Sequence, residues 1–175
     1  ISVGEVVMEG NNKKNSDGKI EPVLKLEFLS HGTLEVDDVD ASRRFYEEFS
    51  GFAGVRTSPV SLMFRLGGTH SYAAVKRGGK KTKMGLLFHN GLDVASDEEV
   101  DKCHQLCVEQ ADKWGMTQVT KPIAQHGTYS FYFWDLDGNS WEILSNPKGG
   151  YGWLFDRGDL DGSGHMAKGY DRPTV

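Results

Sequence analysis

Residues 132–142 read Tyr-Phe-Trp-Asp-Leu-Asp-Gly-Asn-Ser-Trp-Glu. The tip Asp137-Gly138-Asn139 is a strong hairpin signal, and strand-forming residues lie on both sides of it. We therefore predict two paired strands, residues 129–134 and 140–144. Successive side chains of a strand point to opposite faces, so Glu142 should point away from the face that carries Trp141 and Ile143.

The same order of elements is predicted twice in the middle of the chain. Each copy begins with a strand, continues with an amphipathic helix and ends with three short strands. The expected elements of the first copy are 26–36, the helix 39–49 with Asp40 as its N-cap, 54–60, 61–66 and 71–76. Those of the second are 84–94, the helix 97–114 ended by Gly115, 118–124, 129–134 and 140–144. The prediction is an α+β fold with two βαβββ modules, residues 25–78 and 83–147.

Segments of different composition flank this repeat. Residues 1–24 are polar and centre on a Gly-Asn-Lys-rich stretch, which predicts a flexible arm. Residues 148–175 are rich in glycine and aspartate but carry Trp153, Phe155 and Tyr170. Because these aromatic side chains would be costly to expose, we expect this C-terminal extension to fold back over the domain.

Composition excludes several classes of partner. The chain has 175 residues and a formal net charge of −5 with no basic patch, so nucleic acid is not an expected partner. No apolar stretch reaches the roughly 20 residues of a membrane helix, so no membrane partner is expected. Cys103 and Cys107 lie one helical turn apart, a geometry that disfavours a disulfide. Reduced thiols predict a cytoplasmic location.

Three residues of metal-ligating type occupy equivalent positions in the repeat. His31 lies in the opening strand of the first copy, His89 in the opening strand of the second, and Glu142 in the last strand. A carboxylate turned into a concave protein surface is costly unless it is paired or binds a metal. Two imidazoles and one carboxylate form a facial triad that leaves coordination positions open. We therefore predict a divalent metal site.

Two motifs resemble the vicinal oxygen chelate superfamily: His31-Gly32-Thr33-Leu34-Glu35-Val36 followed by Ser42-Arg43-Arg44-Phe45-Tyr46, and the stretch 132–142 quoted above. That superfamily includes glyoxalase I, bleomycin-resistance proteins, methylmalonyl-CoA epimerases and type I extradiol dioxygenases. The resemblance covers residues 26–146 and rests on two stretches, 31–46 and 132–142. It implies a fold in which two βαβββ modules form a curled mixed sheet around a metal. It also implies a small-molecule substrate, and a homodimer is common for the fold.

Within that superfamily, a three-ligand set is most similar to that of the extradiol dioxygenases. This resemblance implies Fe(II), an aromatic diol and O2, with ring cleavage next to the diol. Tyr132 corresponds to an active-site tyrosine, and His126, followed by glycine, resembles a second-shell histidine that acts as acid or base. Trp134 would line the substrate pocket, and His165 could reach the site from the C-terminal extension.

Two other functions remain open at this point. A glyoxalase- or epimerase-like isomerase or lyase would use Mn(II), Zn(II), Ni(II) or Co(II) and a fourth ligand, for which His70 is the candidate. A bleomycin-resistance-like protein would bind a small molecule without chemistry. Such proteins commonly lack the metal triad, so His31, His89 and Glu142 argue against this function.

Overall fold

The computed structural model describes residues 16–18, 22–125, 127–147 and 149–159. The first module forms a four-stranded sheet in the order β1-β4-β3-β2, in which β1 and β4 are parallel. Its helix α1 continues as a π-helical turn, Phe45–Phe49. The elements are β1 (His31–Val36), α1 (Val39–Arg44), β2 (Ala53–Ser58), β3 (Ser61–Arg65) and β4 (Ser71–Lys76).

The second module repeats this topology. Its strands take the order β5-β9-β8-β6, with β5 parallel to β9, and β7 also pairs with β8. The elements are β5 (Asn90–Val94), α2 (Asp97–Trp114), β6 (Gln118–Val119), β7 (Ile123–Gln125), β8 (Thr128–Trp134) and β9 (Ser140–Ser145). A short helix, α3 (Gly152–Arg157), follows. The predicted fold class, α+β with a repeated βαβββ unit, is confirmed.

The opening strand of each module is shorter than predicted. β1 begins at His31 rather than residue 26, and β5 begins at Asn90 rather than residue 84, after a 3₁₀ turn, Leu86–Phe88. β1 starts opposite the first residue of its parallel partner β4, Ser71, and β5 starts opposite Trp141, the second residue of β9, because the residues before them have no strand to pair with. Phe88, the last residue of this 3₁₀ turn, has a side chain that is 72% exposed.

Two smaller predictions were also wrong. The strand expected over residues 118–124 is divided into β6 and β7, which pair with different parts of β8. The N-cap of α1 is Asp38 rather than Asp40. Asp38 has an extended backbone, and its Oδ1 accepts hydrogen bonds from the amides of Asp40 and Ala41, both at 2.9 Å.

Helix α2 covers one face of the second sheet and has the predicted bounds. It begins at the N-cap Ser96 and ends at Gly115, whose φ of 70° is the left-handed conformation that glycine adopts readily. Cys103 and Cys107 are free thiols, and burial raises the pKa of Cys107 to about 12. None of the helices in the described part of the chain is long and apolar enough to cross a membrane.

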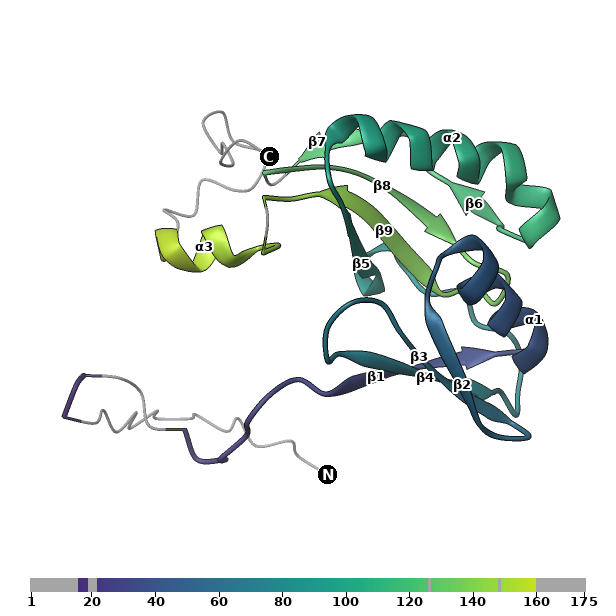
Figure 1. The fold of residues 1–175 in the computed structure, drawn as a ribbon, viewed down its shortest axis with the longest axis horizontal. Helices are drawn as coiled ribbons and strands as arrows, with labels where there is room; N and C mark the ends of the chain where they lie inside the picture. The colour runs from purple at the N-terminus through teal and green to yellow at the C-terminus, as the bar shows by residue number, and fades with distance from the viewer. Residues whose placement is uncertain (1–15, 19–21, 126, 148, 160–175) are drawn as a thin grey trace, which may run out of the picture.

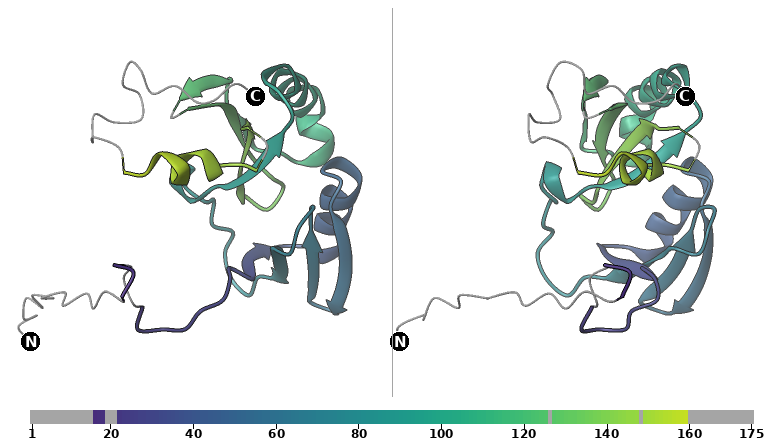
Figure 2. Two further views of the ribbon diagram at one scale, coloured as in Figure 1. Left: turned by 60° about the vertical axis from the view of Figure 1, so that its left-hand side comes forward. Right: turned by 90° about the vertical axis from the view of Figure 1, so that its left-hand side faces the viewer.

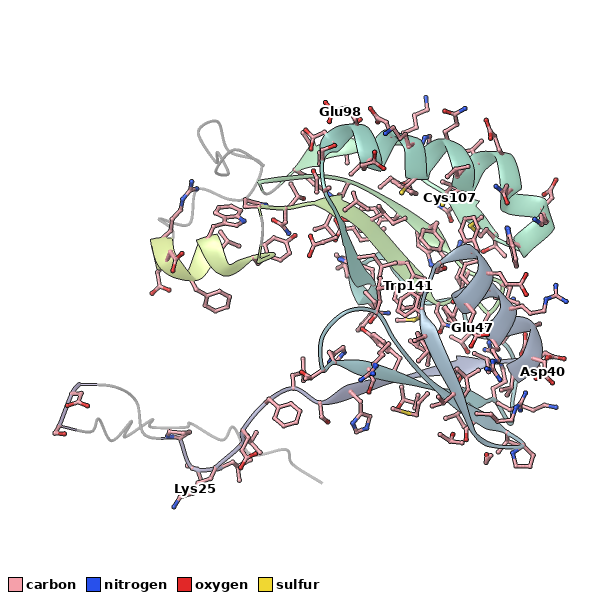
Figure 3. All side chains as sticks on the ribbon, viewed as in Figure 1. Lys25, Asp40, Glu47, Glu98, Cys107 and Trp141 are labelled. Carbon is pink, nitrogen blue, oxygen red and sulfur yellow. The ribbon has the colours of Figure 1, made fainter. Side chains whose placement is uncertain are left out.

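The two modules share one hydrophobic core. Figures 1 and 2 show the second sheet above the first, with α2 on its outer face and α1 between the modules. Trp141 lies where they meet, as the side chains in Figure 3 show. Its ring centroid is 5.9 Å from that of Tyr46, 5.9 Å from that of Phe52 and 5.7 Å from that of Tyr72. Residues of the first module therefore pack on the helix-facing side of the second sheet.

Asp135 is the polar centre of this contact. It is fully buried, and its Oδ2 accepts hydrogen bonds from Tyr46 Oη at 2.6 Å and Trp141 Nε1 at 3.1 Å. Its Oδ1 accepts from the backbone amides of Asp137 and Asn139, both at 2.9 Å. One carboxylate thus holds the β8–β9 turn and a side chain of the other module.

Asp137 makes a second polar connection between the modules. Its Oδ1 accepts from the amide of Asp37 at 2.7 Å, and its Oδ2 accepts from Ser42 Oγ at 2.6 Å. Arg77, which follows β4, donates to the Asp137 carbonyl oxygen at 2.8 Å. Both aspartates of the Asp-Leu-Asp-Gly-Asn stretch therefore fix the turn and join the modules.

Replacing Asp135 by alanine should lower the free energy of unfolding by about 3 kcal/mol, because it leaves several buried donors without an acceptor. Urea denaturation followed by circular dichroism measures the change. Asp112→Ala, on the exposed side of α2, is the matched control and should change stability little. A loss of less than about 1 kcal/mol would contradict the role of Asp135.

Candidate metal centre on the second sheet

Glu142 and Tyr132 lie side by side on the face of the second sheet that α2 does not cover. They are register partners in the antiparallel pair β8–β9. Their strand neighbours Phe131, Phe133 and Trp141 point the other way, into the core. The predicted alternation is confirmed, and it turns the Glu142 carboxylate away from α2. The side chain of Glu142 is nevertheless only 4% exposed.

His89, the residue before β5, completes a contact with this carboxylate. Its Nε2 is 3.2 Å from Glu142 Oε2. Its Nδ1 is 2.6 Å from the carbonyl oxygen of Leu86, which can only accept, so Nδ1 carries a proton. The 3₁₀ turn that replaced the predicted strand therefore orients the imidazole and aims Nε2 at Glu142.

The contact between His89 and Glu142 calls for a positive species between them. In the neutral imidazole protonated at Nδ1, Nε2 is an acceptor, and the carboxylate oxygen is an acceptor too. Two acceptors at 3.2 Å are attractive only with a proton or a cation between them. Ligands about 2.1 Å from a metal, at octahedral or tetrahedral angles, lie about 3.0–3.4 Å apart. The 3.2 Å between His89 Nε2 and Glu142 Oε2 lies in this range, so the two atoms could occupy adjacent coordination positions of one metal ion.

The second oxygen of Glu142 supports the same conclusion. Oε1 is buried and has no hydrogen-bond partner among the described residues. An uncompensated buried carboxylate oxygen costs free energy, and a metal ion or a bound donor would remove that cost. His89 and Glu142 thus fit two ligands of a divalent cation.

Tyr132 supplies a proton donor beside the carboxylate. Gln125 Nε2 donates to Tyr132 Oη at 2.7 Å, which leaves the hydroxyl proton of Tyr132 to point elsewhere. Burial, followed by the negative charge of Glu142 and a hydrogen bond with the Glu142 side chain, raises the pKa of Tyr132 well above its usual value. Its ring lies 4.9 Å from that of His89. Tyr132 is therefore a neutral phenol at physiological pH and can donate to a ligand at this site.

His31, the third predicted ligand, lies on the other sheet. It begins β1, and its side chain is exposed with Nδ1 2.8 Å from Ser30 Oγ. Leu34 and Val36 point into the shared core, so alternation directs His31 away from that core. Within the described residues, no group of three His, Cys, Asp or Glu side chains is placed to hold a metal. One copy of the chain therefore brings together two of the three predicted ligands.

His70 and Trp134 both have other partners in the structure. His70 lies before β4, where its Nδ1 is 3.3 Å from the Leu29 carbonyl oxygen. Trp134 shares a strand face with Tyr132, but its Nε1 donates to the Met84 carbonyl oxygen at 2.6 Å. The Lys83 ammonium lies 4.3 Å from the centre of the Trp134 ring. His70 is thus on the His31 side of the molecule, and Trp134 is enclosed at the edge of the second sheet.

His126 and His165 lie outside the described residues, so the structure places neither. It adds Gln125 and Tyr151, which the sequence analysis did not identify. Tyr151 is half-buried near Glu142, whose charge contributes, after burial, to raising the pKa of the Tyr151 hydroxyl. A glutamine in a short strand belongs to no sequence pattern that would mark it as a site residue. Tyr151 could have been suspected only as an aromatic residue in the glycine-rich extension.

The comparison with protein families agrees with this architecture. Residues 28–143 match the model of the Glyoxalase/Bleomycin resistance protein/Dioxygenase superfamily, so the chain belongs to that superfamily. The superfamily includes enzymes, and the match covers both modules but not the C-terminal extension. None of the curated proteins compared matches the chain.

Solved structures show the same fold. A possible glyoxalase from Bacillus cereus is 28% identical, with a TM-score of 0.55 over 68% of this chain and 99% of that one. A glyoxalase-related enzyme from Fulvimarina pelagi is 25% identical, with a TM-score of 0.56 over 70% and 90%. A glyoxalase/dioxygenase from Nostoc punctiforme, 20% identical, has a TM-score of 0.56 over 74% and 100%. The last of these supports the fold alone.

Glu142→Gln should stabilise the metal-free protein by about 1 kcal/mol, because it removes a buried charge and keeps the shape of the side chain. Chemical denaturation in the presence of a chelator measures this. The same substitution at the exposed Glu48 is the control and should be neutral. A clear destabilisation by Glu142→Gln would mean that the His89 contact already compensates the charge.

Proposed function

We propose that the protein is a metal-dependent enzyme of the extradiol type, which cleaves the ring of a catecholic aromatic compound with Fe(II) and O2. The observation that carries the proposal is the His89–Glu142 contact, in which Nε2 and Oε2 lie 3.2 Å apart beside the phenol of Tyr132. Fe(II), when bound, would hold both oxygens of the diol and leave a position for oxygen. The proposal takes three ligands rather than four because β4, the last strand of the first module, holds no glutamate or glutamine.

The chain's own residues would orient the substrate and manage its protons. Tyr132 keeps its proton, because its pKa is raised, and donates a hydrogen bond to a substrate oxygen. Gln125 holds the Tyr132 hydroxyl in place. The Leu86 carbonyl keeps the proton of His89 on Nδ1, so Nε2 is left to bind the metal. The low exposure of Glu142 strengthens its electrostatic interactions.

We propose that a second copy of the chain supplies His31. His31 is exposed in one copy and points away from the core that its own modules share. The segments that lead into His31 and His89 also expose large apolar side chains, which association would cover. These side chains are Leu26, Phe28, Leu29, Leu86, Leu87 and Phe88. A homodimer with sites shared between copies would satisfy both features.

A glyoxalase- or epimerase-like reaction is the second candidate function. The feature that favours it is the buried carboxylate of Glu142, one oxygen of which has no hydrogen-bond partner among the described residues, since such reactions need a proton acceptor near the metal. His70, the candidate fourth ligand, points instead toward Leu29. Within the part of the chain that the structure describes, no specific contact favours the alternative of a non-catalytic binding protein.

Protein purified without oxygen and loaded with Fe(II) should bind iron and consume oxygen only when a catechol is added. His89→Ala and Glu142→Ala should each lower the affinity for iron at least ~10-fold, because each removes a ligand. Metal analysis and an oxygen electrode measure the two effects. Stoichiometric zinc, nickel or manganese without catechol-dependent oxygen uptake would refute the dioxygenase and favour the isomerase.

Mixed dimers test the origin of the third ligand. His31→Ala and Glu142→Ala chains should each bind iron poorly alone. A heterodimer of the two, isolated with two affinity tags, should contain one intact site and bind about half the iron of the wild type. If His31 acts within its own chain, both sites of the heterodimer lack a ligand and no iron is recovered. Light scattering gives the oligomeric state independently.

A further inference from the structure

The first sheet has a free face that carries His31. Phe64 of β3 points into the shared core, so strand alternation turns Met63 and Arg65 to the opposite face. In Figure 1 helices α1 and α2 both lie on the core side of this sheet. The strands β2, β3 and β4, with the turns between them, lie within residues 53–76, a stretch that the structure describes throughout. His31, Met63 and Arg65 therefore share one face.

Three polar residues form a row across this face. His31 is aligned with Ser71 in the parallel pair β1–β4. In the antiparallel pair β3–β4, Phe64 is aligned with Tyr72. One residue further along each strand, Arg65 therefore lies next to Ser71. Because neighbouring strands are about 4.8 Å apart, the Cα atoms of His31 and Arg65 are about 10 Å apart. Arg65 can thus contact one end of a small molecule whose other end lies beside His31.

A pocket of about 360 Å³ lies at the Arg65 end of this row. Small and apolar side chains form one part of it, and a cation and two hydroxyl groups form the other. The apolar part includes Ala53, Val55 and Met63, and the polar part includes Arg65, Thr69 and Ser71. Val55 is 62% exposed although its side chain is apolar. The pocket therefore suits a molecule that is apolar in one part and carries a hydrogen-bond acceptor in another.

The charge of Arg65 selects the kind of acceptor. Arg65 is exposed and has no ion-pair or hydrogen-bond partner among the described residues. Arg43, Arg56 and Arg77, by contrast, each lie within ion-pair distance of a carboxylate. Glu35, four residues along β1 from the row, lies 4.0 Å from Arg77 instead. A guanidinium is always charged, and its planar fork of donors matches a carboxylate, so an anionic group is favoured beside Arg65.

We infer that Arg65 recognises a carboxylate on the side chain of the catecholic substrate, whose diol binds beside Glu142 of a second copy of the chain. The inference rests on the proposed function, in which His31 of one copy completes the site of the other. His31 brings the pocket on its own face to that site. Met63 and Val55 contact the apolar part of the substrate, and Arg65 pairs with its carboxylate. The separation of about 10 Å between His31 and Arg65 suits a carboxylate on a short side chain of the ring.

Two catechols of the same shape test this recognition. 3-(3,4-Dihydroxyphenyl)propanoate carries a carboxylate where 3-(3,4-dihydroxyphenyl)propanamide carries a neutral amide. Titration calorimetry without oxygen, on the full-length protein loaded with Fe(II), gives both affinities without turnover. The wild type should bind the carboxylate about tenfold more tightly, as expected for one charge-assisted contact. Arg65→Gln should abolish this preference, and Arg65→Lys should keep part of it, with amide binding and iron content unchanged.

Arg44 supplies the matched control. It lies on α1, is exposed, and like Arg65 has no ion-pair partner among the described residues. Arg44→Gln removes the same charge away from the free face and should keep the preference for the carboxylate. No preference in the wild type, an unchanged preference in Arg65→Gln, or an equal loss in Arg44→Gln would overturn the role of Arg65 while leaving the proposed function standing. Failure of the iron-loaded wild type to bind either catechol would overturn both.

Mixed dimers test whether Arg65 acts across copies. In a heterodimer of an Arg65→Gln chain with a Glu142→Ala chain, the one intact metal site takes Glu142 from the first chain and Arg65 from the second. That site should keep the preference for the carboxylate. When one chain carries both substitutions and the other is wild type, the intact metal site faces the substituted position 65, and the preference should be lost. The reverse pattern would place Arg65 in the site of its own chain and overturn the inference.

Discussion

The buried carboxylate of Asp135 is the interaction on which the rest of the structure depends. It accepts hydrogen bonds from its own turn through two backbone amides and from the other module through Tyr46. A buried charge is tolerated only when it is fully hydrogen-bonded, so the turn, the tyrosine and Trp141 must all be in place at once. This requirement fixes how the two βαβββ modules pack.

The shared core in turn decides which faces of the sheets are free. The helix-facing sides of both sheets contribute to one cluster around Trp141, so their other faces carry the polar residues. His89, Glu142 and Tyr132 meet on one of these faces, and His31 lies on the other. Glu142 is buried, and its Oε1 has no hydrogen-bond partner among the described residues, an arrangement that costs free energy. If Glu142 binds a metal as proposed, the same burial that lowers stability serves the site.

The C-terminal extension adds a feature to the family fold. The family model ends at residue 143, whereas Asn146, Tyr151 and Trp153 form contacts of their own at the end of the second sheet. Members of one fold commonly differ in reaction and substrate through segments added to a constant framework.

The sequence by itself determined the repeated order of elements, the bounds of α2 and β4, and the face on which Glu142 lies. These features follow from periodicity, capping residues and strand alternation, which are local. Tertiary structure decided where β1 and β5 begin, because a strand needs a neighbouring strand. It also decided the role of the Asp135 turn, the separation of His31 from His89 and Glu142, and the approach of Tyr151. Each of these depends on contacts between residues far apart in the chain, and local patterns contain no information about such contacts.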